Sequence, residues 1–264
     1  MATTEFGNGT VMSEFGDGVG VVTLNRPEIR NALSSEVLKA LPEAIRSLEQ
    51  NDEVDVLVLT GSDPAFCAGL DLRELGESGA NIDPDQPSIF RGPFPEHTKP
   101  LIGAINGVAV TGGLELALAC DFLIASDRAK FADTHARVGV MPGWGLSVLL
   151  PQAIGVRRAR EMSLTGNYLD AATAADWGLV NRVVPHDFLM STVQAIAQDI
   201  CSNDQEGVRQ MVSTYERTSG TTVDDGWRIE TSMGKEWLQR TGFTPEKVAE
   251  RRAAIQDRGR AQND

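Results

Sequence analysis

The sequence predicts an α/β core followed by a helical C-terminal region. Short apolar runs alternate with glycine-containing turns and helical patterns up to about residue 190, and this alternation is typical of sheets covered by helices. After Asp187 only helical patterns and polar connections follow. We therefore expect a core over residues 1–190 and a helical region over residues 191–264.

The strands of the core are recognised by their β-branched and apolar content. Residues 18–27, GVGVVTLNRP, form a strand that stops at the proline. Ser34 or Ser35 then caps a helix that runs to about Gln50, with apolar residues repeating on one face. Three further runs are apolar almost throughout, as strands covered on both faces are: VDVLVLTG at 54–61, LIGAI at 101–105 and DFLIAS at 121–126.

Residues 144–190 add helices and one more strand. The helical patterns GLSVLLPQAIG, VRRAREMSLTG and DAATAADWG each end at or beside a glycine, and LVNRVVP at 179–185 has the composition of a strand. Residues 76–95 are rich in Gly, Pro and Asp. Their composition predicts a long loop.

Composition and charge exclude several classes of protein. The chain has 264 residues, 41% of them apolar, and no window approaches the roughly 18 consecutive apolar residues of a membrane span. The net charge of −13 disfavours nucleic-acid binding, which depends on Lys and Arg against phosphates. Three cysteines at irregular spacing fit neither a disulfide framework nor a zinc site. With no basic and apolar leader at its start, we expect a cytoplasmic protein without membrane, nucleic-acid or metal partners.

Two glycine-containing turns are candidates for binding an oxyanion. AFCAGLDL at 65–72 follows a buried strand and leads into a helix, and TGGLELA at 111–117 places Gly112 and Gly113 at a helix N-terminus. Free backbone N–H groups from two such turns can converge on one oxygen. Paired donors of this kind suit reactions in which a carbonyl becomes an enolate, because they stabilise charge that develops in the transition state.

Five stretches resemble, in order and spacing, the motifs of the enoyl-CoA hydratase/isomerase, or crotonase, family. They are NRPEIRNAL at 25–33, AFCAGLDL, AINGVAVTGGLELALACD at 104–121, KFADTHARVGVMPG at 130–143 and DAATAADWGLVNRVVP at 170–185. The resemblance implies a crotonase-like core of repeated ββα turns, a helical C-terminal region that mediates trimer formation, and an acyl-CoA thioester as substrate.

The resemblance also implies roles for single residues. The peptide N–H groups of Ala68 and Gly112 correspond to the oxyanion-hole donors of the family. The residues expected to contact the substrate are Glu28, Arg30, Ala32, Gly69, Asp71, Leu72, Arg73, Gly113 and Trp144. Arg73 lies where the family often has a basic residue near the coenzyme A phosphates, whereas Asp71 is also explained as the cap of the following helix. Trp144 either narrows the acyl pocket or packs on the helix behind it.

Glu115 matches one of the two glutamates that hydratases of the family use, and His135 takes the place of the second. Glu115 is the only charge in LELALAC, and a lone buried carboxylate is costly without a partner or a catalytic purpose. An imidazole with an ordinary pKa of about 6.5 exchanges protons near neutrality. His135 is therefore either the partner of Glu115 or a pocket-lining residue. Asp133 either orients it or, in an extended segment, points to the opposite face.

The sequence thus predicts an enoyl-CoA hydratase with Glu115 as main acid and base. Two alternatives stay open: a Δ3,Δ2-enoyl-CoA isomerase, which needs a single base, and a non-catalytic acyl-CoA-binding protein. No cofactor is expected, because coenzyme A is part of the substrate. A homotrimer or dimer of trimers is expected, because an isolated helical region would leave these apolar residues partly exposed: Val193, Ile196, Ile200, Val208 and Met211.

Overall fold

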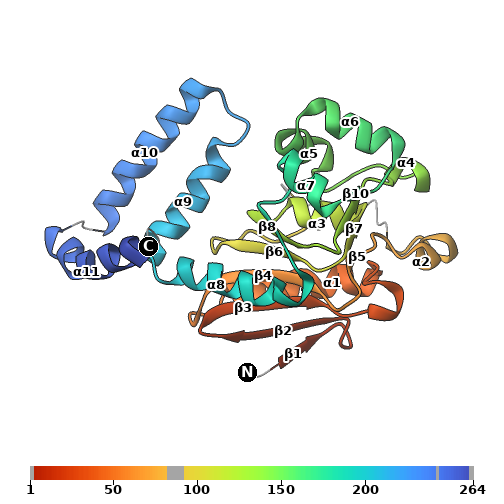
Figure 1. The fold of residues 1–264 in the computed structure, drawn as a ribbon, viewed down its shortest axis with the longest axis horizontal. Helices are drawn as coiled ribbons and strands as arrows, with labels where there is room; N and C mark the ends of the chain where they lie inside the picture. The colour runs from red at the N-terminus through yellow and green to blue at the C-terminus, as the bar shows by residue number, and fades with distance from the viewer. Residues whose placement is uncertain (1–2, 82–91, 242–243, 262–264) are drawn as a thin grey trace. The chain divides into compact units, whose positions relative to one another are not determined.

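Two sheets form the core of the protein (Figure 1). The computed structural model describes residues 3–81, 92–241 and 244–261. The larger sheet has the strand order β1–β2–β3–β4–β6–β8–β11. Its strands are β1 (Thr3–Phe6), β2 (Val11–Gly16), β3 (Gly18–Leu24), β4 (Val54–Gly61), β6 (Leu101–Ile105), β8 (Phe122–Ser126) and β11 (Arg182–Val184). The pairs β1–β2 and β2–β3 are antiparallel, and every pair from β3 onward is parallel.

The smaller sheet has the strand order β10–β9–β7–β5. Its strands are β5 (Ala65–Cys67), β7 (Val108–Val110), β9 (Lys130–Ala132) and β10 (Leu169–Asp170). The strands β4, β6 and β8 are each followed by β5, β7 or β9 and then by a helix: α2 (Leu72–Glu77), α3 (Gly112–Leu118) or α4 (His135–Val138). This repeated ββα unit confirms the predicted spiral core. In each repeat, the helix begins a few residues after the strand of the smaller sheet.

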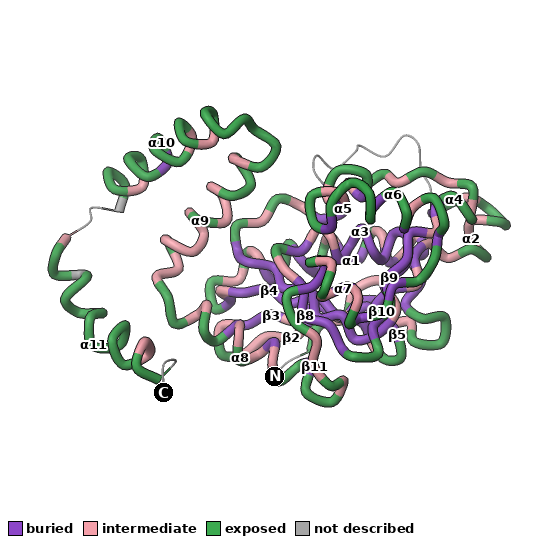
Figure 2. Tube along the Cα trace, turned by 45° about the horizontal axis from the view of Figure 1, so that its top comes forward, coloured by how far each residue is buried: buried purple, intermediate pink, exposed green. Residues whose placement is uncertain are grey.

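Helices cover both faces of the larger sheet. On one face lies α1 (Ser35–Glu49), which Ser34 caps by accepting from Val37 N and which buries an apolar stripe that includes Leu41 and Ile45. On the other face, Val193 and Ala197 of α8 (Leu189–Cys201) pack against β3, β4, β6 and β8. Figure 2 shows the buried residues concentrated in the strands between these helices.

The compact core extends beyond the predicted boundary at residue 190. It comprises Met1–Val208, and a second unit comprises Arg209–Asp264. The difference arises because α8 belongs to the core: Val193 is fully buried, and Ile196 and Ile200 pack on the same apolar cluster. The expectation of partial exposure is therefore wrong for Val193, whereas Ile196 and Ile200 are only partly buried. Met211 differs, since it is 59% exposed.

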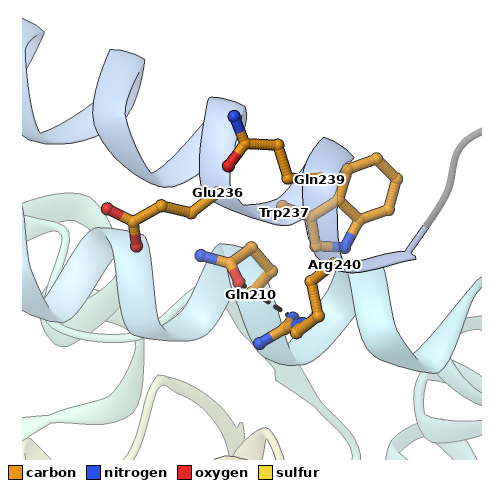
Figure 3. Close-up of a pocket in the computed structure, with 5 residues that line it drawn as sticks. All are labelled: Gln210, Glu236, Trp237, Gln239 and Arg240. Atoms are coloured by element: carbon orange, nitrogen blue, oxygen red, sulfur yellow. Dashed lines mark hydrogen bonds between the residues drawn. The ribbon is translucent and has the colours of Figure 1, made fainter.

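The second unit is helical, as predicted. The helices of this part of the chain are α9 (Gln205–Thr218), which begins in the core unit, α10 (Val223–Thr241) and α11 (Pro245–Ala261). Gln210, Glu236, Trp237, Gln239 and Arg240 line a pocket between α9 and α10 (Figure 3). Arg240 Nη2 donates to Gln210 Oε1 at 3.2 Å, so polar contacts contribute to the pairing of these two helices.

The remaining helices lie between β9 and the end of the core. They are α5 (Leu146–Ile154), α6 (Val156–Thr165), α7 (Ala171–Trp177) and the 3-10 helix η2 (His186–Phe188), while η1 (Pro27–Ile29) precedes α1. Within the described ranges, no helix has the length and apolar content needed to span a bilayer. Of the predicted loop at 76–95, residues 82–91 lie outside the described residues.

Candidate active site

The two predicted glycine turns lie side by side. The parallel pairing of β5 with β7 aligns Cys67 with Ala109, so the turns that follow both strands are neighbours. A Cβ on Gly113 would lie 2.2 Å from Cys67 O, and a Cβ on Gly69 would lie 2.8 Å from Val110 O. Gly69 also has φ +87. Both glycines are required by this close approach of the two backbones.

Gly112 begins α3 with its N–H directed out of the helix. The preceding residue, Thr111, has φ 55 and ψ −116, a conformation that is strained for a β-branched residue. It is held there by a hydrogen bond from Thr111 N to Ala132 O and by contact of its hydroxyl with that of Thr134. Because the first N–H groups of a helix lack intrahelical acceptors, the Gly112 N–H is available for a ligand oxygen.

The Ala68 N–H is not available in the same way. It donates to Arg30 O at 3.0 Å, so the prediction that it is a free oxyanion donor is wrong. Leu33 instead pairs with Leu70 in a parallel bridge, in which Leu33 N donates to Gly69 O and Asp71 N donates to Leu33 O. The Leu70 N–H therefore faces away from Leu33, and no backbone acceptor among the described residues binds it. Leu70 is therefore a candidate donor, which sequence reasoning missed.

Glu115 is buried on α3, and both of its carboxylate oxygens have defined partners. Its side chain is 4% exposed. Oε1 accepts from Trp144 N at 2.7 Å and from Leu146 N at 3.4 Å, and Oε2 lies 3.4 Å from His135 Nε2. The start of α5 thus fixes one oxygen while the other points to the imidazole. Glu115 and His135 are thus in contact, and their catalytic roles stay predictions.

His135 is held between two carboxylates. Its Nδ1 lies 2.6 Å from Asp133 Oδ1, which also accepts from the His135 backbone N–H at 3.1 Å. The chain turns into α4 directly after β9 rather than continuing as a strand. The Asp133 carboxylate therefore faces the His135 ring, and the alternative in which Asp133 points to the opposite face is excluded.

These contacts govern the pKa values of His135 and Asp133. Burial by itself lowers the pKa of His135, but hydrogen bonds from its ring to Asp133 and Glu115 and the charges of both carboxylates raise it to about 9. For Asp133, burial raises the pKa, whereas hydrogen bonds with His135 and Ser163 outweigh burial and lower it. At neutral pH the ring is thus an imidazolium. His135 is therefore expected to exchange protons at a pH above its ordinary pKa, and not near that pKa as the sequence indicated.

Trp144 lies beside the oxyanion position. A Cβ on Gly112 would be 3.4 Å from Trp144 Cζ3 and 3.1 Å from Leu33 Cδ1. The ring is partly buried and packs on the main apolar cluster. Both sequence-based explanations are thus compatible: the indole packs on the core, and its edge narrows the space in front of Gly112.

The residues predicted to contact coenzyme A divide into structural and exposed positions. Asp71 caps α2 by accepting from Arg73 N and Glu74 N, and it pairs with Arg26 at 3.1 Å. The explanation of Asp71 as a helix cap therefore accounts for these contacts. Ala32 is buried in the core. The exposed members of the set are Glu28, Arg30, Leu72 and Arg73.

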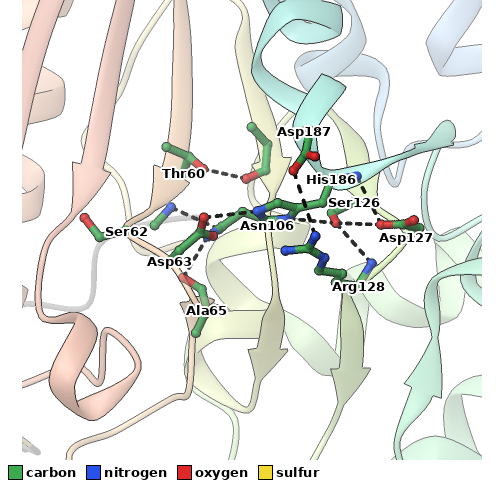
Figure 4. A network of polar contacts seen from close by, with 12 residues as sticks. Thr60, Ser62, Asp63, Ala65, Asn106, Ser126, Asp127, Arg128, His186 and Asp187 are labelled. Carbon is green, nitrogen blue, oxygen red and sulfur yellow. Dashed lines mark hydrogen bonds and ion pairs between the residues drawn. The ribbon is translucent and has the colours of Figure 1, made fainter.

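A second Asp–His pair lies at the carboxyl ends of the large-sheet strands (Figure 4). His186 Nε2 is 3.0 Å from Asp63 Oδ2, and His186 Nδ1 is 3.0 Å from Ser126 Oγ. Asn106 donates to Asp63 at 2.8 Å, and Arg128 N donates to the buried Ser126 hydroxyl. The side chain of His186 is partly buried, with 14% of its surface exposed. These contacts tie β4, β6, β8 and β11 together.

Comparison with known proteins gives consistent results. The family model for enoyl-CoA hydratase/isomerase matches residues 14–253. A probable peroxisomal enoyl-CoA hydratase of Arabidopsis thaliana is 38% identical over 244 residues, which cover 92% of this chain and 91% of the relative. A crystal structure of an enoyl-CoA hydratase from Mycobacterium avium has a TM-score of 0.73 and 47% identity, covering 88% of this chain and 99% of that one. The 1,2-epoxyphenylacetyl-CoA isomerase of Escherichia coli is 33% identical over 232 residues, 83% of this chain and 87% of the relative.

Proposed function

The chain belongs to the enoyl-CoA hydratase/isomerase family, and on that premise we propose that it is an enoyl-CoA hydratase, which adds water across the α,β double bond of an acyl-CoA thioester. The observation that carries this proposal is the contact of two buried acid–base groups, Glu115 and His135, beside the free N–H of Gly112. The substrate brings its own coenzyme A, so we propose no cofactor. The cytoplasmic location expected from the sequence stays a prediction.

The thioester carbonyl binds at the two glycine turns. The N–H groups of Gly112 and Leu70 donate to its oxygen, and these donors bind most strongly when the oxygen carries the negative charge of the enolate. Because the backbone positions both donors before substrate arrives, their orientation costs nothing during the reaction. The indole of Trp144 lies against Gly112 and limits the room for the acyl chain next to the carbonyl.

The reacting water lies beside the Glu115–His135 pair, within reach of both groups, because the two side chains are in direct contact with each other. Glu115 Oε1 is held by two backbone N–H groups, so Oε2 is the oxygen that accepts the water proton. The imidazole of His135 supplies the proton that the α-carbon needs. Hydration requires both transfers, and the 3.4 Å contact between Glu115 Oε2 and His135 Nε2 supports a role for these groups on one water molecule.

The second candidate function is an enoyl-CoA isomerase. The matching family model includes isomerases as well as hydratases, and a single base such as Glu115 can move one proton between two carbons. Turnover of a panel of enoyl thioesters separates the two functions. A hydratase consumes the conjugated chromophore of 2-enoyl thioesters, whereas an isomerase generates that chromophore from 3-enoyl thioesters.

Charge reversal at Arg30 or Arg73 is expected to weaken binding of acyl-CoA more than binding of the matching pantetheine thioester. Both arginines are exposed near the predicted coenzyme A segments, and a ligand senses nearby charges more than distant screened ones, even in a chain of net charge −13. Calorimetric titration of Arg30→Glu and Arg73→Glu with both ligands measures the difference. Arg157→Glu, an exposed substitution on α6, is the matched control. Equal losses for both ligands would show that the two arginines do not read the phosphates.

We also propose a homotrimer or dimer of trimers. The helices α9, α10 and α11 expose large apolar side chains, among them Met211, Tyr215, Trp227 and Ile255, and exposed apolar residues in such numbers mark an interface. Light scattering at micromolar concentration is expected to give the mass of three or six chains. A stable monomer would contradict the proposal.

A further inference from the structure

We propose that Asp133 is a positioning residue that keeps His135 protonated and aimed at Glu115, so that Glu115 and His135 act as one proton relay. This inference rests on the proposed hydratase function, which it deepens by assigning the acid of the reaction and the group that orients it. Asp133 itself touches neither water nor substrate in this scheme.

The orientation of the ring follows from the Asp133 contacts. A single carboxylate oxygen, Oδ1, accepts both from the His135 backbone N–H at 3.1 Å and from the ring at 2.6 Å. An ionised carboxylate has no proton to donate, so the ring nitrogen Nδ1 must carry the hydrogen. The opposite nitrogen, Nε2, is thereby directed to Glu115. Ser163 of α6 hydrogen-bonds Asp133 and holds the carboxylate in place.

A proton between His135 Nε2 and Glu115 is required by their burial. The two side chains are 6% and 4% exposed, and their facing atoms are 3.4 Å apart. Without a proton, a nitrogen lone pair and a carboxylate oxygen would face each other away from water, which is costly. The charged groups that act on the ring are Asp133, from the turn before α4, and Glu115, from α3. Both are acidic, so both favour the imidazolium.

The relay balances over one turnover. Glu115 takes a proton from water as the water oxygen bonds to the β-carbon, and the electron pair of the double bond moves onto the thioester as an enolate. His135 Nε2 then gives its proton to the α-carbon, and the enolate returns to a thioester. The proton held by Glu115 finally passes across the contact to Nε2, which restores the carboxylate and the imidazolium. One water has been added, and Asp133 stays negative throughout.

Asp133→Asn tests this inference, since the amide keeps an acceptor for Nδ1–H but removes the charge. We expect kcat for hydration to fall about 10- to 100-fold, by analogy with the loss of carboxylates that orient metal-bound histidines, with a much smaller change in KM. The alkaline limb of the rate profile, near pH 9 in the wild type from the raised pKa of His135, should move toward neutral pH. The inference is overturned if the wild type hydrates enoyl thioesters and Asp133→Asn keeps its kcat and pH profile.

The second Asp–His pair supplies a matched control. Asp63→Asn removes the carboxylate that lies 3.0 Å from His186 (Figure 4), and neither residue is part of the candidate site. This variant is expected to retain the wild-type kcat and alkaline limb. A loss equal to that of Asp133→Asn would attribute the effect to general weakening of the core and would overturn the inference.

Nitrogen NMR of the histidine rings tests the inference without turnover. The chain has three histidines, so the signals of His135 can be assigned against those of His97 and His186. At pH 7.5 both ring nitrogens of His135 should be protonated in the wild type, and a neutral ring would overturn the inference. A wild type that hydrates no enoyl thioester would instead refute the proposed function, and the ring titration of Asp133→Asn compared with that of the wild type would still decide whether Asp133 holds the proton on His135.

Discussion

Glu115→Gln is expected to lower the rate of enoyl thioester hydration on the order of 10,000-fold, the upper end of the range for one acid–base group. The amide cannot take the proton of water, and it cannot return a proton to His135, so both halves of the catalytic cycle fail. Folding should be preserved, because the amide oxygen still accepts from Trp144 N and Leu146 N. Loss of the conjugated enoyl absorbance measures the rate, and calorimetry should show that an acyl-CoA still binds.

Glu161→Gln is the control for Glu115→Gln, since Glu161 lies exposed on α6. It is expected to hydrate at the wild-type rate. Hydration by Glu115→Gln at more than about a tenth of the wild-type rate would assign the base to another residue. If the wild type and both variants, Glu115→Gln and His135→Ala, bind acyl-CoA but turn over no enoyl thioester, the protein is a binding protein and not an enzyme.

His135→Ala is expected to lower hydration about 100- to 10,000-fold, because the α-carbon loses its proton donor. In the wild type the rate should fall as pH rises through about 9, where the imidazolium loses its proton. This limb is a property of the Glu115–His135 pair, since the two groups are coupled. In His135→Ala the limb should disappear. Unchanged turnover in this variant, with complete loss in Glu115→Gln, would favour the single-base isomerase.

The imidazole also compensates the charge of its neighbours, and this changes the prediction for His135→Glu. From the family motif alone, restoring a glutamate is expected to retain or raise hydration. In the structure, the new carboxylate would lie between Asp133 and Glu115, and three buried acidic groups without a cation repel one another. We therefore expect His135→Glu to be impaired and the double variant His135→Glu, Asp133→Asn to recover part of the activity. If the double variant recovers no hydration activity, this explanation is contradicted.

The sequence by itself determined the apolar strands of the core and the start of the helix that carries Glu115, whereas the repeated ββα core and the pairing of Glu115 with His135 were implied by the resemblance to the family. Apolar strands that end at glycine or proline report local periodicity, which needs no knowledge of the fold. Gly112 and Gly113 mark the start of a helix in the same local way. Glu115 stands out because it is the only charge in an apolar run, and a buried charge needs a reason.

Only the tertiary structure decided the contacts between segments distant in the chain. The Ala68 N–H donates to Arg30 O, so Leu70 is left as the free donor, and no local pattern distinguishes the two residues. The burial of Val193 depends on α8 packing against strands at the far end of the sequence. The pKa of His135 depends on its distances from Asp133 and Glu115, because electrostatic interaction falls with separation and rises with burial. Sequence spacing specifies neither distance nor burial, and both arise when the strands and helices pack together.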